Sequence, residues 1–145
     1  MKLFTIGFTK KSAEKFFNLL CSANVKRIVD IRLKNESQLA GFAKKNDLKF
    51  FLKNICGIDY IHIPELAPTK EILEEYKKYK GDWDNFENKF SHLLKNRDIE
   101  TAMKGKINDN DCLLCSEHDP EQCHRKIVAN YFVEIWRNIE IKHLV

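Results

Sequence analysis

The sequence predicts an α/β fold, a three-layer sandwich with a mostly parallel five-stranded sheet of the Rossmann-like kind. The first observation is that short β-branched runs alternate with amphipathic helical stretches along the 145 residues. Such alternation favours right-handed crossovers, which place helices on both faces of a parallel sheet. The second observation is that the chain has only 5 Gly and 3 Pro, and that no internal repeat or linker divides it into separate units. We therefore expect a single domain over residues 1–145.

The first strand and the first helix have clear signals. An apolar run over residues 3–6, closed by Gly7, predicts a strand. Ser12 is a typical helix N-cap, and apolar residues follow it at the spacing of a core-facing stripe. That stripe consists of Ala13, Phe16, Phe17 and Leu20.

The next elements are predicted from runs and their stop signals. Residues 26–32 form a β-branched run that ends in charge, which predicts a second strand. A helix is expected from 47 to about 56, where Gly57 ends it. Residues 60–63 predict a third strand, ended by a proline.

The second half of the chain continues the alternation. Thr69 caps one predicted helix, and a further helix is expected from about 82 to 94. Residues 112–115 predict a buried strand, and residues 139–145 predict the last one. Between these two, Asp119 followed by Pro120 predicts a helix start, with Asp as the N-cap and Pro at the first helical position.

The segment from Cys115 to Arg125 joins a strand end to this helix start, where ligands bind in parallel sheets. Helical periodicity places Cys123 and His124 on the inward side of the first turn. The helix dipole and free N–H groups there favour an anion and lower the pKa of a thiol. We therefore predict that Cys123 is the most reactive cysteine and that Arg125 offers a bidentate donor to an anion. Buried structural roles for the same residues are the alternative.

A zinc site built from Cys112, Cys115, Cys123 and His124 is not expected. Residues three apart in a strand point to opposite faces, and adjacent helical residues diverge by roughly 100°. We therefore predict no metal and no cofactor.

The five cysteines and the composition also suggest a compartment. An odd number of cysteines without a secretory signal predicts reduced thiols rather than a disulfide framework. No apolar run approaches the roughly 18 residues that cross a bilayer. We expect a cytoplasmic protein that has no membrane partner.

Several motifs together carry a resemblance that each alone would not. They are Thr5-Ile6-Gly7, Val29-Asp30-Ile31-Arg32, Gly41-Phe42, Tyr60, His62, Pro64-Glu65-Leu66, Leu113 to Glu117, Asp119 to Arg125, and His143-Leu144. With them the chain resembles the family named domain of unknown function 488 over nearly its whole length. Phe8-Thr9 and Leu33 to Ser37 depart from the family's usual His-Ser and Pro-and-Arg-rich loop. The resemblance implies an α/β fold and supplies no reaction.

The matching polar residues fall at strand ends or at the start of the last helix, which favours a functional cleft. The predicted catalytic residues are Cys123, His124, Cys115 and Glu117. The residues predicted to bind the substrate or anion are Gly7, Asp30, Arg32, His62, Glu65 and Arg125. The favoured function is binding or processing of a small phosphate- or nucleotide-like anion.

A non-catalytic nucleic-acid-associated module is the alternative function. Residues 1–50 contain 11 basic and 4 acidic side chains, a balance of +7 within a total of +4. The basic residues Lys34, Lys44, Lys45 and Lys49 lie near Phe42, Phe50 and Phe51. A solvated helix face is the simpler explanation, so we expect at most weak, non-specific binding that falls steeply with salt. Tight, sequence-dependent binding at moderate salt would favour the module.

Overall fold

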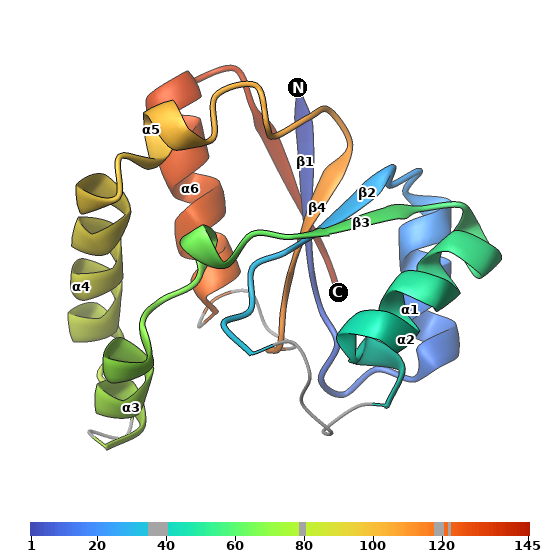
Figure 1. Ribbon diagram of the computed structural model, residues 1–145, viewed down its shortest axis with the longest axis horizontal. Helices are drawn as coiled ribbons and strands as arrows, with labels where there is room; N and C mark the ends of the chain where they lie inside the picture. Colours follow the sequence, from blue (N-terminus) through green and yellow to red (C-terminus); the bar gives the residue numbers. More distant parts are fainter. Residues whose placement is uncertain (35–40, 79–80, 118–120, 122) are drawn as a thin grey trace.

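A five-stranded sheet lies at the centre of the computed structural model, which describes residues 1–34, 41–78, 81–117, 121 and 123–145 (Figure 1). Every strand pairing in the described part of the chain is parallel, and the strand order is β3-β2-β4-β1-β5. The predicted α/β class and five-stranded parallel sheet are confirmed. The strands are β1 (Lys2–Gly7), β2 (Arg27–Asp30), β3 (Asp59–His62), β4 (Asp111–Cys115) and β5 (Glu140–Leu144).

One face of the sheet is covered by the helices of the first half of the chain (Figure 1). They are η1 (Gly41–Ala43), α1 (Ala13–Ser22), α2 (Lys45–Phe51) and η2 (Leu52–Cys56), the last a π-helical turn. The Ser12 hydroxyl accepts a hydrogen bond from the Lys15 amide at 3.1 Å, so the predicted N-cap is confirmed. Gly57 ends η2 with a φ of 66°, the left-handed conformation that favours glycine.

The opposite face carries the helices of the second half (Figure 1), which completes the predicted three layers. The Asp82 and Thr69 side chains accept the Asn85 and Ile72 amides at 3.2 Å, as N-caps do. The elements are η3 (Pro64–Leu66), α3 (Lys70–Lys78), α4 (Trp83–Asn96), α5 (Ile99–Ala102) and α6 (His124–Trp136).

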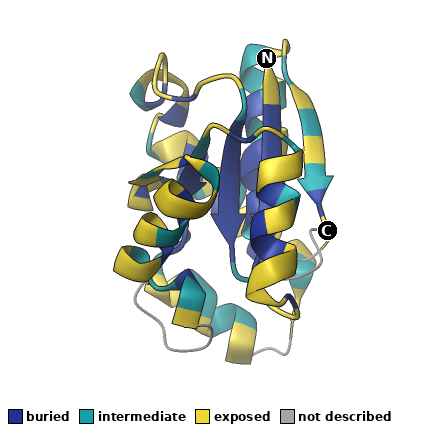
Figure 2. Cartoon of the chain, turned by 90° about the vertical axis from the view of Figure 1, so that its right-hand side faces the viewer, coloured by how far each residue is buried: buried dark blue, intermediate teal, exposed yellow. Residues whose placement is uncertain are grey.

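Burial follows the strand order. Figure 2 shows the inner strands dark blue and the outward helix faces yellow. All five residues of β4 are buried, whereas the edge strands β3 and β5 alternate between exposed and half-buried residues up to the buried Leu144. No helix in the described ranges is long and apolar enough to span a membrane.

Two predicted boundaries were wrong. β2 ends at Asp30 rather than at 32 because the Asp30 carboxylate accepts the Arg32 amide at 3.1 Å, which turns the chain. α6 begins at His124, with Cys123 as its N-cap in an extended conformation (φ −134°, ψ 140°). The predicted N-cap Asp119 and the following Pro120 lie outside the described residues.

The strand order brings the ends of the three inner strands together. β4 lies between β2 and β1, with Gly7 beside Cys115 and Asp30 beside Leu114. On the other side of β2, Asp30 pairs with His62. The carboxyl edge of the sheet therefore gathers residues from four strands, and ligands bind at this edge in α/β folds.

Candidate functional site

Cys115, Cys123 and His124 form a thiol–imidazole cluster at the end of the central strand. Cys115 is the last residue of β4, and the other two residues begin α6. Their two sulfur atoms and an imidazole nitrogen all lie within 4.8 Å of one another. Both cysteines are only 2% exposed. The cluster sits at the edge where the sequence predicted a site.

The His124 imidazole is oriented by two contacts. Its Nε2 lies 2.8 Å from the carbonyl oxygen of Ile31, and its Nδ1 lies 3.2 Å from the Cys115 sulfur. Because a carbonyl can only accept, Nε2 carries the hydrogen and Nδ1 presents a lone pair to the sulfur. Burial lowers the pKa of His124 to about 4, so the ring is neutral at neutral pH.

The cysteines are paired, so the expectation of reduced thiols was wrong for four of the five. Disulfides join Cys115 to Cys123 and Cys21 to Cys56, and Cys112 is free and buried. The Cα atoms of Cys21 and Cys56 lie 5.5 Å apart because α1 and η2 pack side by side. Burial raises the pKa of the Cys112 thiol.

The predicted position of Cys123 needs correction. It is an N-cap with extended backbone, so helical periodicity does not orient its side chain. Cys123 and His124 therefore converge on Cys115 instead of diverging. Cys112 packs in the core with residues such as Phe4 and Leu114, away from the cluster, as the strand pattern indicated.

A network of hydrogen bonds around the buried Asp30–Arg32 ion pair lies beside the cluster. We call it the Asp30 network; it consists of Asp30, Arg32, Tyr60 and His62. Arg32 donates Nε and Nη2 to the two Asp30 oxygens at 2.9 and 2.8 Å. The Tyr60 hydroxyl donates to the same carboxylate at 2.5 Å. The His62 Nε2 lies 2.7 Å from the Arg32 carbonyl oxygen and holds the turn after β2. Arg32 is thus bound to an internal carboxylate.

Arg125 is fully buried against the end of β1. Its Nη1 donates to the Glu117 carbonyl oxygen, and its Nε lies 3.4 Å from the Thr5 hydroxyl. That hydroxyl in turn lies 2.6 Å from Nδ1 of His143. The Glu117 side chain is exposed, so its backbone rather than its carboxylate meets this corner. Gly7 lies against the same carbonyl and leaves no room for a side chain.

Lys11 is a candidate that the sequence did not suggest. Its residue is only 7% exposed, although the adjacent Lys10 is exposed. Burial, followed by the positive charges of Arg125 and Lys15, lowers the pKa of Lys11 to about 8. Two adjacent lysines in a sequence indicate a solvated surface. Only the fold shows that Lys11 is buried and that the charge of the buried Arg125 acts on it.

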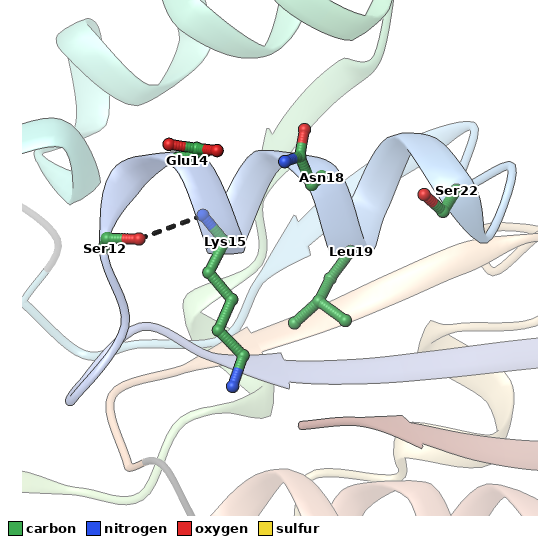
Figure 3. Close-up of a pocket in the computed structure, with 6 residues that line it drawn as sticks. All are labelled: Ser12, Glu14, Lys15, Asn18, Leu19 and Ser22. Atoms are coloured by element: carbon green, nitrogen blue, oxygen red, sulfur yellow. Dashed lines mark hydrogen bonds between the residues drawn. The ribbon is translucent and has the colours of Figure 1, made fainter.

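Two surface hollows do not include the thiol–imidazole cluster. One of about 550 Å³ includes His62 and the exposed Glu65, with Arg27 and Lys106 on its rim. A second of about 530 Å³ runs along α1, lined by Ser12, Glu14, Lys15, Asn18, Leu19 and Ser22 (Figure 3). Neither is lined by a residue of the thiol–imidazole cluster. The cluster is a packed centre and not the floor of either hollow.

The basic segment near residue 45 is partly packed. Phe42 and Phe51 lie against Phe17 with ring centroids 5.9 and 6.1 Å away, whereas Phe50 is 61% exposed. Two of the three phenylalanines considered for base stacking therefore contribute to the core. The nucleic-acid module stays a prediction without a specific contact in its favour.

We expect the protein to lose stability as the pH falls from about 6.5 to 4. His124 has a folded pKa of about 4 against an ordinary 6.5, so the unfolded chain binds the proton first in this window. This one group costs up to about 3 kcal/mol of unfolding free energy by pH 4. Urea unfolding of the wild type and His124→Gln across this range measures it. The variant should show a flatter slope between pH 6.5 and 4, and equal slopes would contradict a buried neutral imidazole.

Comparison with known proteins gives a family but no activity. The model of a family described as domain of unknown function DUF488 matches residues 12–132. No curated protein and no solved structure matches the chain. The matched region contains β2, β3 and β4 and the whole thiol–imidazole cluster.

Proposed function

The chain belongs to the DUF488 family, and from this premise we propose that it binds and processes a small anionic ligand at the carboxyl edge of its sheet. Cys115 and His124 are the proposed chemical centre, and Cys115 replaces the Cys123 nucleophile of the sequence prediction because His124 Nδ1 contacts Cys115 Sγ. The observation that carries the proposal is the 3.2 Å contact between Cys115 Sγ and a His124 Nδ1 whose lone pair is fixed by the Ile31 carbonyl. A nucleophile, a base and a group that orients the base are the minimal parts of covalent catalysis.

The proposed chemistry requires the reduced protein. A reductant such as a phosphine with water, or a dithiol, converts the Cys115–Cys123 disulfide to two thiols and is itself oxidised. The Cys115 thiol then gives its proton to His124 Nδ1 as sulfur bonds to an electrophilic atom of the ligand. The leaving group departs with the electrons of the broken bond. Cys123 is the neighbouring thiol, and an added oxidant such as a disulfide reagent, which takes up two electrons and two protons, re-forms the Cys115–Cys123 bond.

The anionic character of the ligand is inferred from two buried cations. Lys11 and Arg125 are both buried, and burial followed by the positive charge of Arg125 lowers the pKa of Lys11. A carboxylate or phosphate that binds at this end of β1 would be attracted by both positive charges. Asp30, Arg32 and His62 act in this proposal as positioning residues, because their contacts hold the turn that contains Ile31. Gly7 lies at this edge, whereas the side chains of Glu65 and Glu117 are exposed.

The experiment compares an anionic and a neutral thiol reagent on the reduced full chain. Iodoacetate and iodoacetamide both form a carbon–sulfur bond and release iodide, but only iodoacetate is charged. Peptide mapping follows each cysteine with time. We expect the iodoacetate-to-iodoacetamide rate ratio at Cys115 to exceed that at the exposed Cys21 by about tenfold through electrostatic attraction. Lys11→Gln should lower the ratio, and the exposed Lys10→Gln is the matched control.

His124→Gln should slow the reaction of Cys115 with both reagents while the fold, followed by circular dichroism, is retained. The buried Cys112 is an internal standard for a thiol without access. If Cys115 reacts no faster than Cys112, or only in denaturant, the thiol role is excluded. Equal rate ratios at Cys115 and Cys21 would exclude the anionic ligand.

A further inference from the structure

We propose that the reduced thiol–imidazole cluster binds one Zn²⁺ ion through Cys115 Sγ, Cys123 Sγ and His124 Nδ1. The three donors of this set lie within 4.8 Å of one another. Zinc bonds of about 2.3 Å to sulfur and 2.0–2.1 Å to nitrogen put tetrahedral donors about 3.5–3.8 Å apart. Once the Cys115–Cys123 bond is reduced, the two sulfurs have to separate to about 3.8 Å for the three donors to surround an ion.

The histidine is already oriented as a metal ligand. Metal-bound imidazoles usually donate their other ring N–H to a carbonyl or carboxylate, which fixes the tautomer and the ring plane. His124 makes this contact with the Ile31 carbonyl at 2.8 Å, and its opposite nitrogen faces the sulfur atoms. Phe90 packs edge-on against the ring, with centroids 5.8 Å apart, and further restricts it.

The donor set selects the metal class. Two thiolates and one imidazole suit zinc, whereas Mg²⁺ and Ca²⁺ need oxygen ligands. Two thiolates also neutralise the charge of a divalent ion at a site where both cysteines are 2% exposed. Among the residues that the structure describes, no other group of three such side chains meets this way. Three protein ligands leave the fourth tetrahedral position for water or a ligand atom.

The disulfide and the metal are mutually exclusive states of the same two sulfurs. The Cys115–Cys123 bond leaves neither sulfur as a thiolate ligand. Reduction adds two electrons and two protons, and zinc then displaces the two thiol protons as it binds. Metal content is therefore expected to follow the redox state. The expectation of no metal assumed diverging side chains, which the extended backbone of Cys123 removes.

The test uses the full chain in both redox states. One sample keeps its disulfides, and the other is reduced with a phosphine that is then removed without oxygen. Zn²⁺ is titrated in competition with a chromophoric chelator, and Co²⁺ provides a spectroscopic probe of sulfur ligation. We expect one tightly bound ion per reduced chain, release of about two protons per ion, and loss of stoichiometric binding in the oxidised chain.

Variants separate this site from the other cysteine pair. Cys123→Ser and His124→Gln should lose stoichiometric zinc, and Cys123→Ser should also lower sulfur-to-cobalt charge transfer. The double variant Cys21→Ser/Cys56→Ser is the matched control and should keep the ion. Zinc that survives in Cys123→Ser and His124→Gln, or that disappears in the Cys21/Cys56 variant, would overturn the proposal. So would a folded reduced chain that binds none.

The titration follows metal binding and not alkylation of Cys115, so its outcome is distinguishable from that of the proposed ligand chemistry. Stoichiometric zinc with no iodoacetate preference at Cys115 would support the metal site while excluding the anionic ligand. An iodoacetate preference without zinc binding would overturn the metal site alone.

Discussion

Replacing Gly7 with alanine is expected to destabilise the protein by about 4 kcal/mol or more, or to prevent its folding. A β-carbon on Gly7 would overlap the Glu117 carbonyl oxygen and lie 2.6 Å from the carbonyl carbon. It would also lie 2.7 Å from Nη1 of the buried Arg125. The carbonyl carbon and oxygen of Glu117 belong to the backbone, so they cannot move aside as the end of a flexible side chain can. Overpacking in such a rigid region is costly.

Denaturant unfolding of Gly7→Ala against Gly41→Ala measures this effect. No heavy atom lies within 4 Å of a β-carbon built on Gly41, so that variant should change the unfolding free energy by less than about 0.5 kcal/mol. Insoluble or unfolded Gly7→Ala beside a folded control agrees with the expectation. A Gly7→Ala protein within about 1 kcal/mol of the wild type would show that the end of β1 is not packed as described.

Asp30→Asn is expected to cost about 3–5 kcal/mol because it leaves the buried Arg32 charge without its counter-charge. Asp30 is fully buried, Arg32 is 3% exposed, and the carboxylate accepts from the guanidinium, the Arg32 amide and Tyr60. Asp59→Asn is the matched control. Its ion pair with Lys53 is 3.0 Å long but both side chains are about two-thirds exposed, and such pairs contribute less than about 1 kcal/mol.

A double-mutant cycle isolates the pair. Arg32→Met in the Asp30→Asn background removes the unpaired charge and should recover part of the loss, so the two substitutions should be far from additive. Tyr60→Phe removes one hydrogen bond and should cost about 1.5–3 kcal/mol, as expected for a bond to a charged group. Additive effects of Asp30→Asn and Arg32→Met would contradict a coupled pair.

The helix caps and strand cores could be predicted because their signals are local. Ser12, Thr69 and Asp82 cap helices through side chains only three residues from the amides that they accept. Phe16, Phe17 and Leu20 of the predicted stripe face the core as their spacing indicated, whereas Ala13 is exposed. The position of the polar residues at the carboxyl edge of the sheet could also be predicted, because parallel strands place their carboxyl ends at the same edge.

Which residues meet in the candidate site could not be predicted from the sequence, because it depends on contacts between distant segments of the chain. Cys115 and His124 meet only because Cys123 leaves helical geometry, and the Ile31 carbonyl that orients the imidazole is 93 positions away. The cysteine count gave no information on pairing, since Cys21 and Cys56 are brought together by helix packing across 35 positions. Lys11 and Lys10 are adjacent and chemically identical, yet the fold buries only one of them.

The place of β4 in the sheet also affects synthesis of the chain. β1 and β2 are translated early, but they do not pair with each other, because β4 lies between them. Asp111 follows its partner Arg27 by 84 positions, which take about 4–17 seconds to translate at about 5–20 residues per second. During that interval both strands have an unpaired edge that another chain could occupy. Arrival of β4 covers the facing edges of β1 and β2, but the other edge of β1 stays open until β5 is made, so β1 of the nascent polypeptide has an unpaired strand edge until residues 140–144 emerge from the ribosome.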